Sequence, residues 1–431
     1  MADRLLFPPT TVADMRQRGW DAPDFVYVSG DAYVDHPSFG AAVIVRTLEA
    51  AGYRVAVLAQ PHWKNANDFK RFGRPNYGFL VSSGVIDSMV NHYTAAKRRR
   101  SSDVYTPGGK AAKRPDRAVN VYCHLIREAY GDIPIAIGGV EASLRRFAHY
   151  DYWDDAVRPS ILVDSGADLL MFGMGERSIL VTADWMSRGA PAWECAKMRG
   201  VCFLSPSAMR GSIEIPSFED CVKSKKKYGE AFLVQYNEQD PIRGHAISQR
   251  HGDAYLVQTI PDMPLNRNEL DHSYTLPYQR TWHPDYDALG GVPAIEEVQF
   301  SIAHTRGCFG SCSFCAITFL QGRIVTTRSH ESVLEEAKAI TQMPNFKGYI
   351  HDVGGPTANF RRAACDKQLK FGTCAGRQCL FPKPCPNMVV DHTDYIKLLR
   401  EIRSLPKVKK VFVRSGLRYD YIMADKSDAF L

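Results

Sequence analysis

The sequence lacks any long apolar run. No stretch of its 431 residues approaches the roughly 18 consecutive apolar residues of a membrane-spanning helix. The first residues, MADRLLFPPTT, mix acidic and basic side chains and precede a run too short for the apolar part of a signal peptide. The formal charge of +7 permits an anionic partner but does not require one. We therefore expect a cytoplasmic protein that makes no membrane contact.

Disulfide bonds are also not expected. The chain has 11 cysteines and no recognisable export signal, and the cytosol keeps thiols reduced. Seven of the cysteines are clustered, which favours metal ligands over cross-links. The other four are scattered along the chain and are expected to be packing residues: Cys123, Cys195, Cys202 and Cys221.

Three of the clustered cysteines lie in the string RGCFGSCSFC, directly after the apolar segment 298–303. Cys308, Cys312 and Cys315 form a CxxxCxxC run that can hold three corners of a cubane iron–sulfur cluster. A zinc knuckle or three buried thiols are the alternatives, but zinc loops usually use CxxC pairs. With three ligands rather than four, one iron keeps an open position, as catalytic zinc does. The spacing therefore predicts a [4Fe–4S] cluster that binds S-adenosylmethionine.

The cysteine run, with Phe314 before its last cysteine, resembles the radical SAM superfamily. The resemblance implies that the open iron binds the methionine part of S-adenosylmethionine. It also implies that the reduced cluster cleaves the cofactor to a 5′-deoxyadenosyl radical, which abstracts hydrogen from a substrate. Such chemistry needs an electron donor, such as flavodoxin or ferredoxin. The cofactor carries the difficult step, and the protein orients and shields it.

Two further strings resemble the YgiQ-type radical SAM proteins, and this resemblance covers nearly the whole chain. They are GGVEASLRRFAHYDYWDD (138–155) and DVGGPTANF (352–360). The superfamily's GGE motif, which binds the cofactor's ammonium group, corresponds here to Gly354, Gly355 and Pro356. The carboxylate is lost, so backbone carbonyls or Thr357 would take over this role. The resemblance assigns the cofactor's carboxylate or ribose to two residues near the end of the chain, Arg414 and Ser415.

The N-terminal part alternates apolar strand runs with helical patterns. Strands are expected at 24–28, 53–58, 79–83, 133–137 and 168–173, and a helix at 39–51. This alternation predicts a doubly wound parallel sheet, whose ligand crevice lies at the carboxyl ends of the strands. The residues expected at that edge are Gly30, Asp35, His36, Gly84, Gly138, Gly139, Glu141, Gly173 and Gly175.

Such a domain resembles the cobalamin-binding-like domain that precedes some radical SAM barrels. The DxHxxG signature of cobalamin binding is absent, because Asp35 and His36 are adjacent and Gly40 is out of register. We therefore do not expect cobalamin. His36 is better explained by a turn closed by Pro37 before a helix.

Two segments of the N-terminal part each have more than one possible role. The glycine pair and the aromatic and charged residues of 138–155 fit either ligand recognition or an interdomain seam. The basic segment 97–117 can grip phosphates, which would suit RNA, but a solvated loop is the commoner outcome. Nucleic acid is therefore a weakly supported partner.

The chain is expected to divide into an N-terminal α/β domain at 1–228, a connector at 229–293 and the first part of a radical SAM barrel at 294–431. Barrel strands are expected at 297–303, 348–353 and 408–414, and helices at 329–342 and 393–405. These elements make about half of a six-unit (β/α) barrel. An open parallel sheet exposes an edge, so we expect the chain to be a truncated piece of a longer protein.

Four more cysteines follow the glycine pair: Cys365, Cys374, Cys379 and Cys385. Four soft ligands in one segment can hold a second iron–sulfur cluster or a zinc ion, and Cys₄ suits both. Unpaired loop thiols are the remaining alternative. For the whole protein we predict a radical SAM enzyme with an unknown substrate. A non-catalytic or electron-transfer iron–sulfur protein is the rival, and RNA modification is a second enzymatic alternative.

Overall fold

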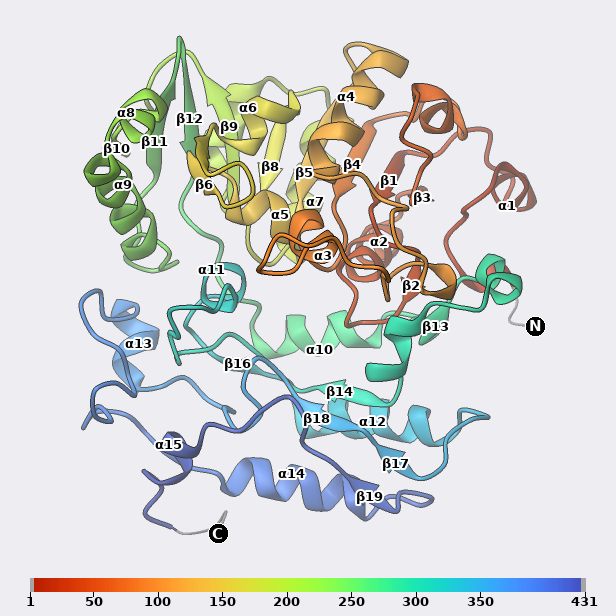
Figure 1. The fold of residues 1–431 in the computed structure, drawn as a ribbon. Helices are drawn as coiled ribbons and strands as arrows, with labels where there is room; N and C mark the ends of the chain where they lie inside the picture. Colours follow the sequence, from red (N-terminus) through yellow and green to blue (C-terminus); the bar gives the residue numbers. More distant parts are fainter. Residues whose placement is uncertain (1–3, 428–431) are drawn as a thin grey trace. The chain divides into compact units, whose positions relative to one another are not determined.

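The computed structural model describes residues 4–427, which form two compact units (Figure 1). Unit 1 contains the residues up to Glu238 together with Gly244–Asp262 and Pro277–Ile295. Unit 2 contains Gln239–Arg243, Met263–Leu276 and the residues from Glu296 onward. The chain therefore passes between the two units several times.

Unit 1 is built on a nine-stranded sheet with the order β10-β11-β12-β9-β8-β5-β4-β1-β3. The five strands from β8 to β3 are parallel, which confirms the predicted parallel α/β sheet. β9 and β12 join this part in antiparallel pairings. The strands are β1 (Phe25–Ser29), β3 (Val55–Ala59), β4 (Gly78–Ser82), β5 (Ile135–Gly138), β8 (Leu169–Met171), β9 (Val201–Ser205), β10 (Ile213–Ile215), β11 (Ile247–His251) and β12 (Ala254–Gln258).

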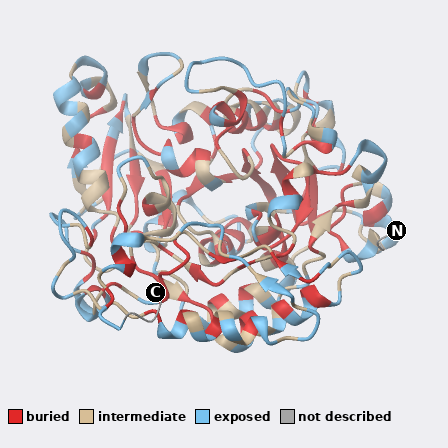
Figure 2. Ribbon diagram, turned by 60° about the horizontal axis from the view of Figure 1, so that its bottom comes forward, coloured by how far each residue is buried: buried red, intermediate tan, exposed pale blue. Residues whose placement is uncertain are grey.

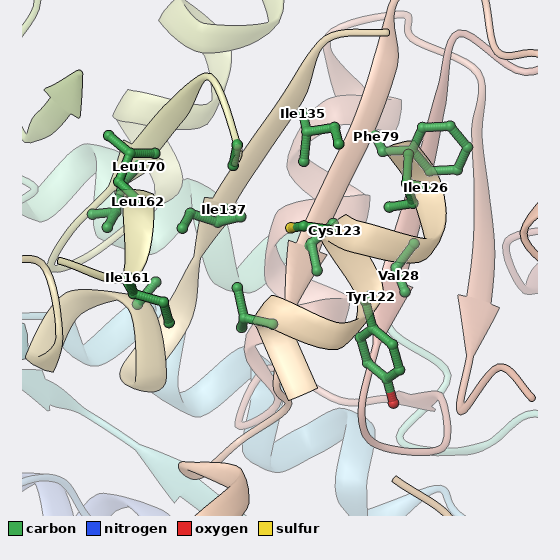
Figure 3. Close-up of a cluster of buried hydrophobic side chains, with 14 of the residues drawn as sticks. Val28, Phe79, Tyr122, Cys123, Ile126, Ile135, Ile137, Ile161, Leu162 and Leu170 are labelled. Atoms are coloured by element: carbon green, nitrogen blue, oxygen red, sulfur yellow. The ribbon is translucent and has the colours of Figure 1, made fainter. Parts of the chain in front are cut away.

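Both faces of the parallel strands are covered. Every residue of β1 is buried, so its side chains face packed protein on both sides of the sheet. On one face, Val28 and Ile137 pack in a cluster with Tyr122 and Cys123 of α4 (Ala118–Tyr130) (Figure 3). Helix α2 (Gly40–Ala50) packs against β1, β3 and α7 (Glu176–Ser187). The sheet is thus doubly wound, as predicted.

Short helices and strand pairs complete unit 1. The remaining helices are α1 (Val12–Gln17), α3 (Ser88–His92), α5 (Gly139–Leu144), α6 (Ile161–Ser165), α8 (Phe218–Lys223) and α9 (Lys225–Asn237). Two small antiparallel pairs are β2 (Val34–Asp35) with β13 (Thr281–Trp282), and β6 (His149–Asp151) with β7 (Ala156–Arg158).

The predicted connector 229–293 is not a separate linker in the structure, because its residues belong partly to unit 1 and partly to unit 2. β11 and β12 of this segment are part of the sheet of unit 1, and α10 (Arg267–Thr275) belongs to unit 2. The sequence suggested a connector because β11 reads ISQRH. Its Gln249 is nevertheless buried, because its side chain accepts from the Ala148 N–H and donates to the Pro216 carbonyl.

Unit 2 contains three parallel strand segments followed by helices. β14 (Ser301–Ala303) pairs with β18 (Asp352–Gly354), and β17 (Tyr349–Ile350), directly before β18, pairs with β19 (Lys410–Val411). A small antiparallel pair, β15 (Thr305–Arg306) with β16 (Thr326–Thr327), follows β14. The helices are α11 (Ile317–Gln321), α12 (His330–Thr341), α13 (Asp366–Phe371), α14 (Thr393–Arg403) and α15 (Tyr419–Ile422).

The core of unit 2 lies between these strands and helices α12 and α14. Ile302 and Val353 of the strands pack with Val333 of α12 and Leu398 of α14, and all four are buried. Figure 2 shows buried positions along the strands and exposed positions along the outer helix faces. This arrangement is the βαβαβ unit predicted from the sequence. Within residues 4–427, none of the helices has the length and apolar character needed to cross a membrane.

Candidate cofactor site

The predicted cysteine loop follows β14 and is framed by the β15–β16 pair. Just before the loop, the His304 N–H donates to the Gly354 carbonyl at 2.9 Å, which joins the ends of β14 and β18. The Cys308 N–H donates to the Gly322 carbonyl at 3.0 Å and closes the loop. Gly307 has φ +81°, and a Cβ there would lie 2.2 Å from the Ile324 carbonyl oxygen. Only glycine fits at this position.

The three thiols of the loop are near enough to influence one another. Burial raises the pKa of the Cys308 thiol, and the charges of Cys312 and Cys315 raise it further. Two hydrogen bonds oppose this shift: the Thr357 hydroxyl lies 3.3 Å from Cys308 Sγ, and the Gly310 N–H lies 3.4 Å from it. Neighbouring thiols with hydrogen-bond donors beside them suit thiolate ligands.

Arg418 contacts the same loop. Its Nη1 donates to Cys312 Sγ at 3.1 Å, and its guanidinium also pairs with Asp420. The backbone of Arg418 is held by buried Asn359, whose Oδ1 accepts from the Arg418 N–H and whose Nδ2 donates to the Arg418 carbonyl. Sequence reasoning did not identify Arg418 as a site residue, because it lies 106 residues from Cys312 and in no local motif.

A cluster of aromatic rings holds the cysteine loop in place. Phe309 stacks on Phe360 with 3.8 Å between the ring centroids, and Tyr421 packs edge-on against both rings. All three residues are buried. Phe314, in contrast, has 90% of its surface exposed. The cluster fixes the beginning of the cysteine loop to the segment that follows the glycine pair.

The glycine pair at the end of β18 lies beside Ser415. The Gly355 N–H donates to Ser415 Oγ at 3.3 Å. A Cβ on Gly354 would lie 1.7 Å from Ser415 Oγ, and one on Gly355 would lie 2.3 Å from Thr305 Cγ2. Both positions therefore require glycine, and Pro356 follows them with intermediate exposure.

Arg414 points to a different partner. Its backbone N–H donates to Asp352 Oδ1 at 2.7 Å, but its exposed guanidinium forms an ion pair with Glu297 at 3.1 Å. Of the predicted cofactor residues, the structure thus brings Gly354, Gly355 and Ser415 together, and Arg414 makes a surface ion pair.

Among the described residues 4–427, no three His, Cys, Asp or Glu side chains are already arranged as ligands of one metal ion. This holds equally for Cys308–Cys315 and for the later cysteines. The donor set nevertheless fits an iron–sulfur cluster, because three soft thiols on one loop have neighbouring hydrogen-bond donors. Metal sites are seldom fully preformed before the metal binds.

The polar residues at the sheet edge of unit 1 mostly bind one another. Buried Glu141 accepts from the Ser88 N–H and hydroxyl and from the Val119 N–H, and so caps the start of two helices. Asp31, next to Gly30, pairs with buried Arg114, and burial raises the pKa of Asp31 to about 6. Edge residues near Gly30, Gly84 and Glu141 are thus brought together, as expected.

The segments 138–155 and 97–117 are joined by ion pairs within unit 1. Arg117 pairs with Asp151 at 3.0 Å and with Asp154 at 2.7 Å. Buried Arg114 also belongs to the basic segment, so that segment is not simply a solvated loop. Tyr150 and Tyr152 remain exposed on and beside β6. These contacts account for much of the charge density noted in the sequence.

Comparison with known proteins adds independent findings. The family described as Radical SAM N-terminal matches residues 7–301. A UPF0313 protein of Clostridium botulinum (strain ATCC 19397 / Type A) is 57% identical over 426 residues, which cover 98% of this chain and 66% of that protein. A UPF0313 protein of Clostridium perfringens (strain SM101 / Type A) is also 57% identical, over 98% of this chain and 64% of that protein. The chain thus spans slightly less than two thirds of these relatives.

Among solved structures, the chain is similar to the radical S-adenosylmethionine methyltransferase TsrM from Kitasatospora setae, with 15% identity and a TM-score of 0.40. That match covers 77% of this chain and 47% of TsrM. A second TsrM structure, with cobalamin and a [4Fe–4S] cluster bound, has a TM-score of 0.42. This similarity is too low to carry an argument about ligands, so the expectation on cobalamin stays a prediction. The family match and the UPF0313 relatives together show that the chain belongs to the Radical SAM N-terminal family.

Proposed function

We propose that unit 2 binds a [4Fe–4S] cluster through Cys308, Cys312 and Cys315 and binds S-adenosylmethionine beside it. The observation that carries this proposal is the joining of the cysteine loop and the glycine pair. The two lie at the ends of neighbouring parallel strands, and Cys308 and Thr357 are in contact across them. Ligand sites of parallel α/β folds lie at this end of the strands.

When bound, the cluster and S-adenosylmethionine would together supply a reductive cleavage that yields a 5′-deoxyadenosyl radical. The chain's own residues would hold and orient these groups. Gly310 and Arg418 donate hydrogen bonds to cysteine sulfurs, and the Thr357 hydroxyl would donate to a Cys308 thiolate, which favours the thiolate form. Such donors, together with the positive charge of Arg418, also stabilise a cluster that gains an electron.

The glycine pair would receive the cofactor's methionine part. Because Gly354 and Gly355 have no side chains, Ser415 and Thr305 approach the strand end closely, so the backbone of the pair lies beside two hydroxyl-bearing residues. Ser415 adds a hydroxyl at the same place, at hydrogen-bond distance from the Gly355 N–H. The missing carboxylate of the GGE pattern is therefore replaced by backbone oxygens and hydroxyl groups in this proposal.

The substrate stays unassigned. An electron donor such as flavodoxin or ferredoxin and a reducing cytoplasmic environment follow from this proposal, because the cluster must be reduced before it reacts. The non-catalytic rival predicts a cluster whose properties do not change with S-adenosylmethionine. RNA modification is less favoured, since Arg114 and Arg117 of the basic segment already pair with carboxylates of unit 1.

The test is electron paramagnetic resonance of anaerobically reconstituted protein. We expect the signal of a reduced [4Fe–4S] cluster, which changes shape when S-adenosylmethionine is added. The triple variant Cys308→Ala, Cys312→Ala, Cys315→Ala should lose the part of the signal that responds to S-adenosylmethionine, and the control Cys195→Ala, in unit 1, should keep it. A signal in the triple variant that still responds to S-adenosylmethionine would overturn the assignment, and a wild-type signal that does not change with S-adenosylmethionine would favour the rival.

A further inference from the structure

The segment 364–389 contains four cysteines but little regular structure. Only the six-residue helix α13 interrupts it. Its two ends are nevertheless joined, because the Val389 N–H donates to the Ala364 carbonyl at 2.9 Å. A second bond, from the Cys385 N–H to the Cys379 carbonyl at 2.8 Å, closes a tight loop inside it. The segment is therefore a closed loop that starts and ends beside its first and last cysteines.

Arg323 holds the middle of this loop. Its Nη1 donates to the Cys374 carbonyl at 2.9 Å and its Nη2 to the Arg377 carbonyl at 3.0 Å. The Arg323 carbonyl in turn accepts from Gln368 Nε2 at 3.1 Å. One arginine thus fixes three points of a segment whose Leu369, Phe371 and Phe381 side chains are exposed and add little packing.

Asp240 holds the stretch that leads into Cys374. Its Oδ2 accepts from the Thr373 N–H at 2.6 Å and from the Thr373 hydroxyl at 2.7 Å. Arg243 donates to the Thr373 carbonyl at 2.7 Å. Gly372 has φ +77°, and a Cβ there would lie 2.3 Å from Asp240 Oδ1. The backbone before Cys374 therefore has a defined path, although Cys374 itself is exposed.

The contacts that close this loop lie at or beside its cysteines. Cys365 follows Ala364 at the closing bond, Cys379 and Cys385 share a backbone hydrogen bond, and the Cys374 carbonyl is bound by Arg323. A soft metal ion would bring the four thiols of such a loop together as its ligands. Cys₄ is a complete ligand set for a zinc ion or for a [4Fe–4S] cluster.

The loop is also connected to the first cysteine loop. Gln378 Nε2 donates to the Ser311 carbonyl at 3.3 Å. Buried Leu380 belongs to the same hydrophobic cluster as Phe309, and Cys308 and Cys379 pack against that cluster from their two loops. A site in the second loop would thus stabilise the position of the first.

We propose that Cys365, Cys374, Cys379 and Cys385 form a second, tetrathiolate metal site. Its ligand is either one zinc ion or one further iron–sulfur cluster, since both present the same soft cationic centre to four thiolates. The site uses none of the residues assigned to S-adenosylmethionine or to the first cluster. It can therefore exist whether or not the proposed catalytic function is correct.

The experiment compares metal content among variants of the full chain purified without oxygen. Iron, zinc and acid-labile sulfide are measured per chain in the variant Cys308→Ala, Cys312→Ala, Cys315→Ala. We expect this variant to retain one zinc ion, or iron and sulfide in equal amounts. Adding Cys374→Ala should remove that metal, and adding the control Cys195→Ala should not. Because Cys374 is exposed, its replacement leaves no cavity in the core.

A second pair of variants tests the role of Arg323. Arg323→Lys keeps the positive charge but replaces the two separate guanidinium donors by a single nitrogen, so metal should be lost to a chelator about 10-fold faster. Arg414→Lys is the control, because Arg414 contacts Glu297 on the surface. Equal rates of metal loss in Arg323→Lys and Arg414→Lys would contradict the proposed role of Arg323.

The wild-type chain gives a measurement that does not depend on how the variants fold. We expect it to hold more metal than one [4Fe–4S] cluster accounts for, namely zinc in addition or more than ~4 iron atoms. X-ray absorption of the triple variant should show four sulfur neighbours around the metal. A wild-type chain with a single cluster, no zinc and four thiols that react freely with an alkylating reagent would overturn the proposal.

Discussion

Gly307→Ala is expected to loosen the cysteine loop. Gly307 has φ +81°, and an added Cβ would lie 2.2 Å from the Ile324 carbonyl oxygen. Left-handed backbone costs a residue with a side chain about 1–2 kcal/mol. Forcing an atom into a packed contact adds about 1–3 kcal/mol. The closed loop should therefore be disfavoured by about 2–5 kcal/mol in total. The oxygen belongs to the backbone, so a side-chain rotation cannot relieve the contact.

Gly322→Ala is the matched control in the same loop. Gly322 has φ +75°, but nothing lies within 4 Å of a Cβ built there. Its backbone, with φ +75° and ψ −179°, is one that only glycine adopts readily, so alanine should suffer a backbone cost of about 1–3 kcal/mol without the collision. The assay is the rate at which reconstituted protein loses iron to a chelator of ferrous ions. We expect Gly307→Ala to lose iron about tenfold faster than Gly322→Ala, as ~1.4 kcal/mol implies. Equal rates would refute the reasoning.

Two further outcomes follow from contacts in unit 2. Arg418→Gln should lower the reduction potential of the cluster, because a positive charge and a donor to Cys312 Sγ are lost, whereas Arg414→Gln should leave it unchanged. Potentiometric titration checks this, and equal potentials in both variants would count against the Arg418 contact. Burial lowers the pKa of His304 from 6.5 to about 3. The folded state then binds fewer protons than the unfolded state between these values, so stability present above pH 6.5 is lost as the pH falls. His304→Gln should flatten this dependence in hydrogen exchange of β14 and β18, and an unchanged pH dependence would contradict it.

The parallel sheet could be predicted because its strands are short apolar runs. Phe25–Ser29 and Val55–Ala59 are buried along almost their whole length, so their hydrophobicity is continuous and easily recognised. The helix at 329–342 was equally clear, because Ser329 is an N-cap that accepts from the Ser332 N–H. Local sequence was sufficient for these elements.

The strands of the supposed connector could not be predicted in the same way. β11 contains Ser248, Gln249 and His251, which read as solvent-exposed residues but are buried. Hydrogen bonds to distant parts of unit 1 satisfy Gln249, and Phe218 stacks on the ring of His251. The burial of these residues depends on tertiary contacts, which a local sequence pattern does not show.

The candidate site likewise has parts that the local sequence predicts and parts that depend on long-range contacts. The cysteine spacing and the glycine pair are local motifs, and both were recognised in the sequence. Arg418 and Asn359 belong to the site through contacts between segments far apart in the chain. The ion pair of Arg414 with Glu297 is a similar long-range contact. Only the structure shows that the Ser415 side chain faces the glycine pair, whereas the Arg414 side chain pairs with Glu297.

The most direct test of the central claim is the formation of 5′-deoxyadenosine. Reconstituted wild-type protein is reduced with dithionite and incubated with S-adenosylmethionine, and the product is quantified by mass spectrometry. We predict that wild-type protein forms 5′-deoxyadenosine and that the variant Cys308→Ala, Cys312→Ala, Cys315→Ala forms none above the level of protein-free controls. Equal product from the wild-type and the triple variant, or none from a wild-type protein with a fully occupied and reduced cluster, would contradict the account.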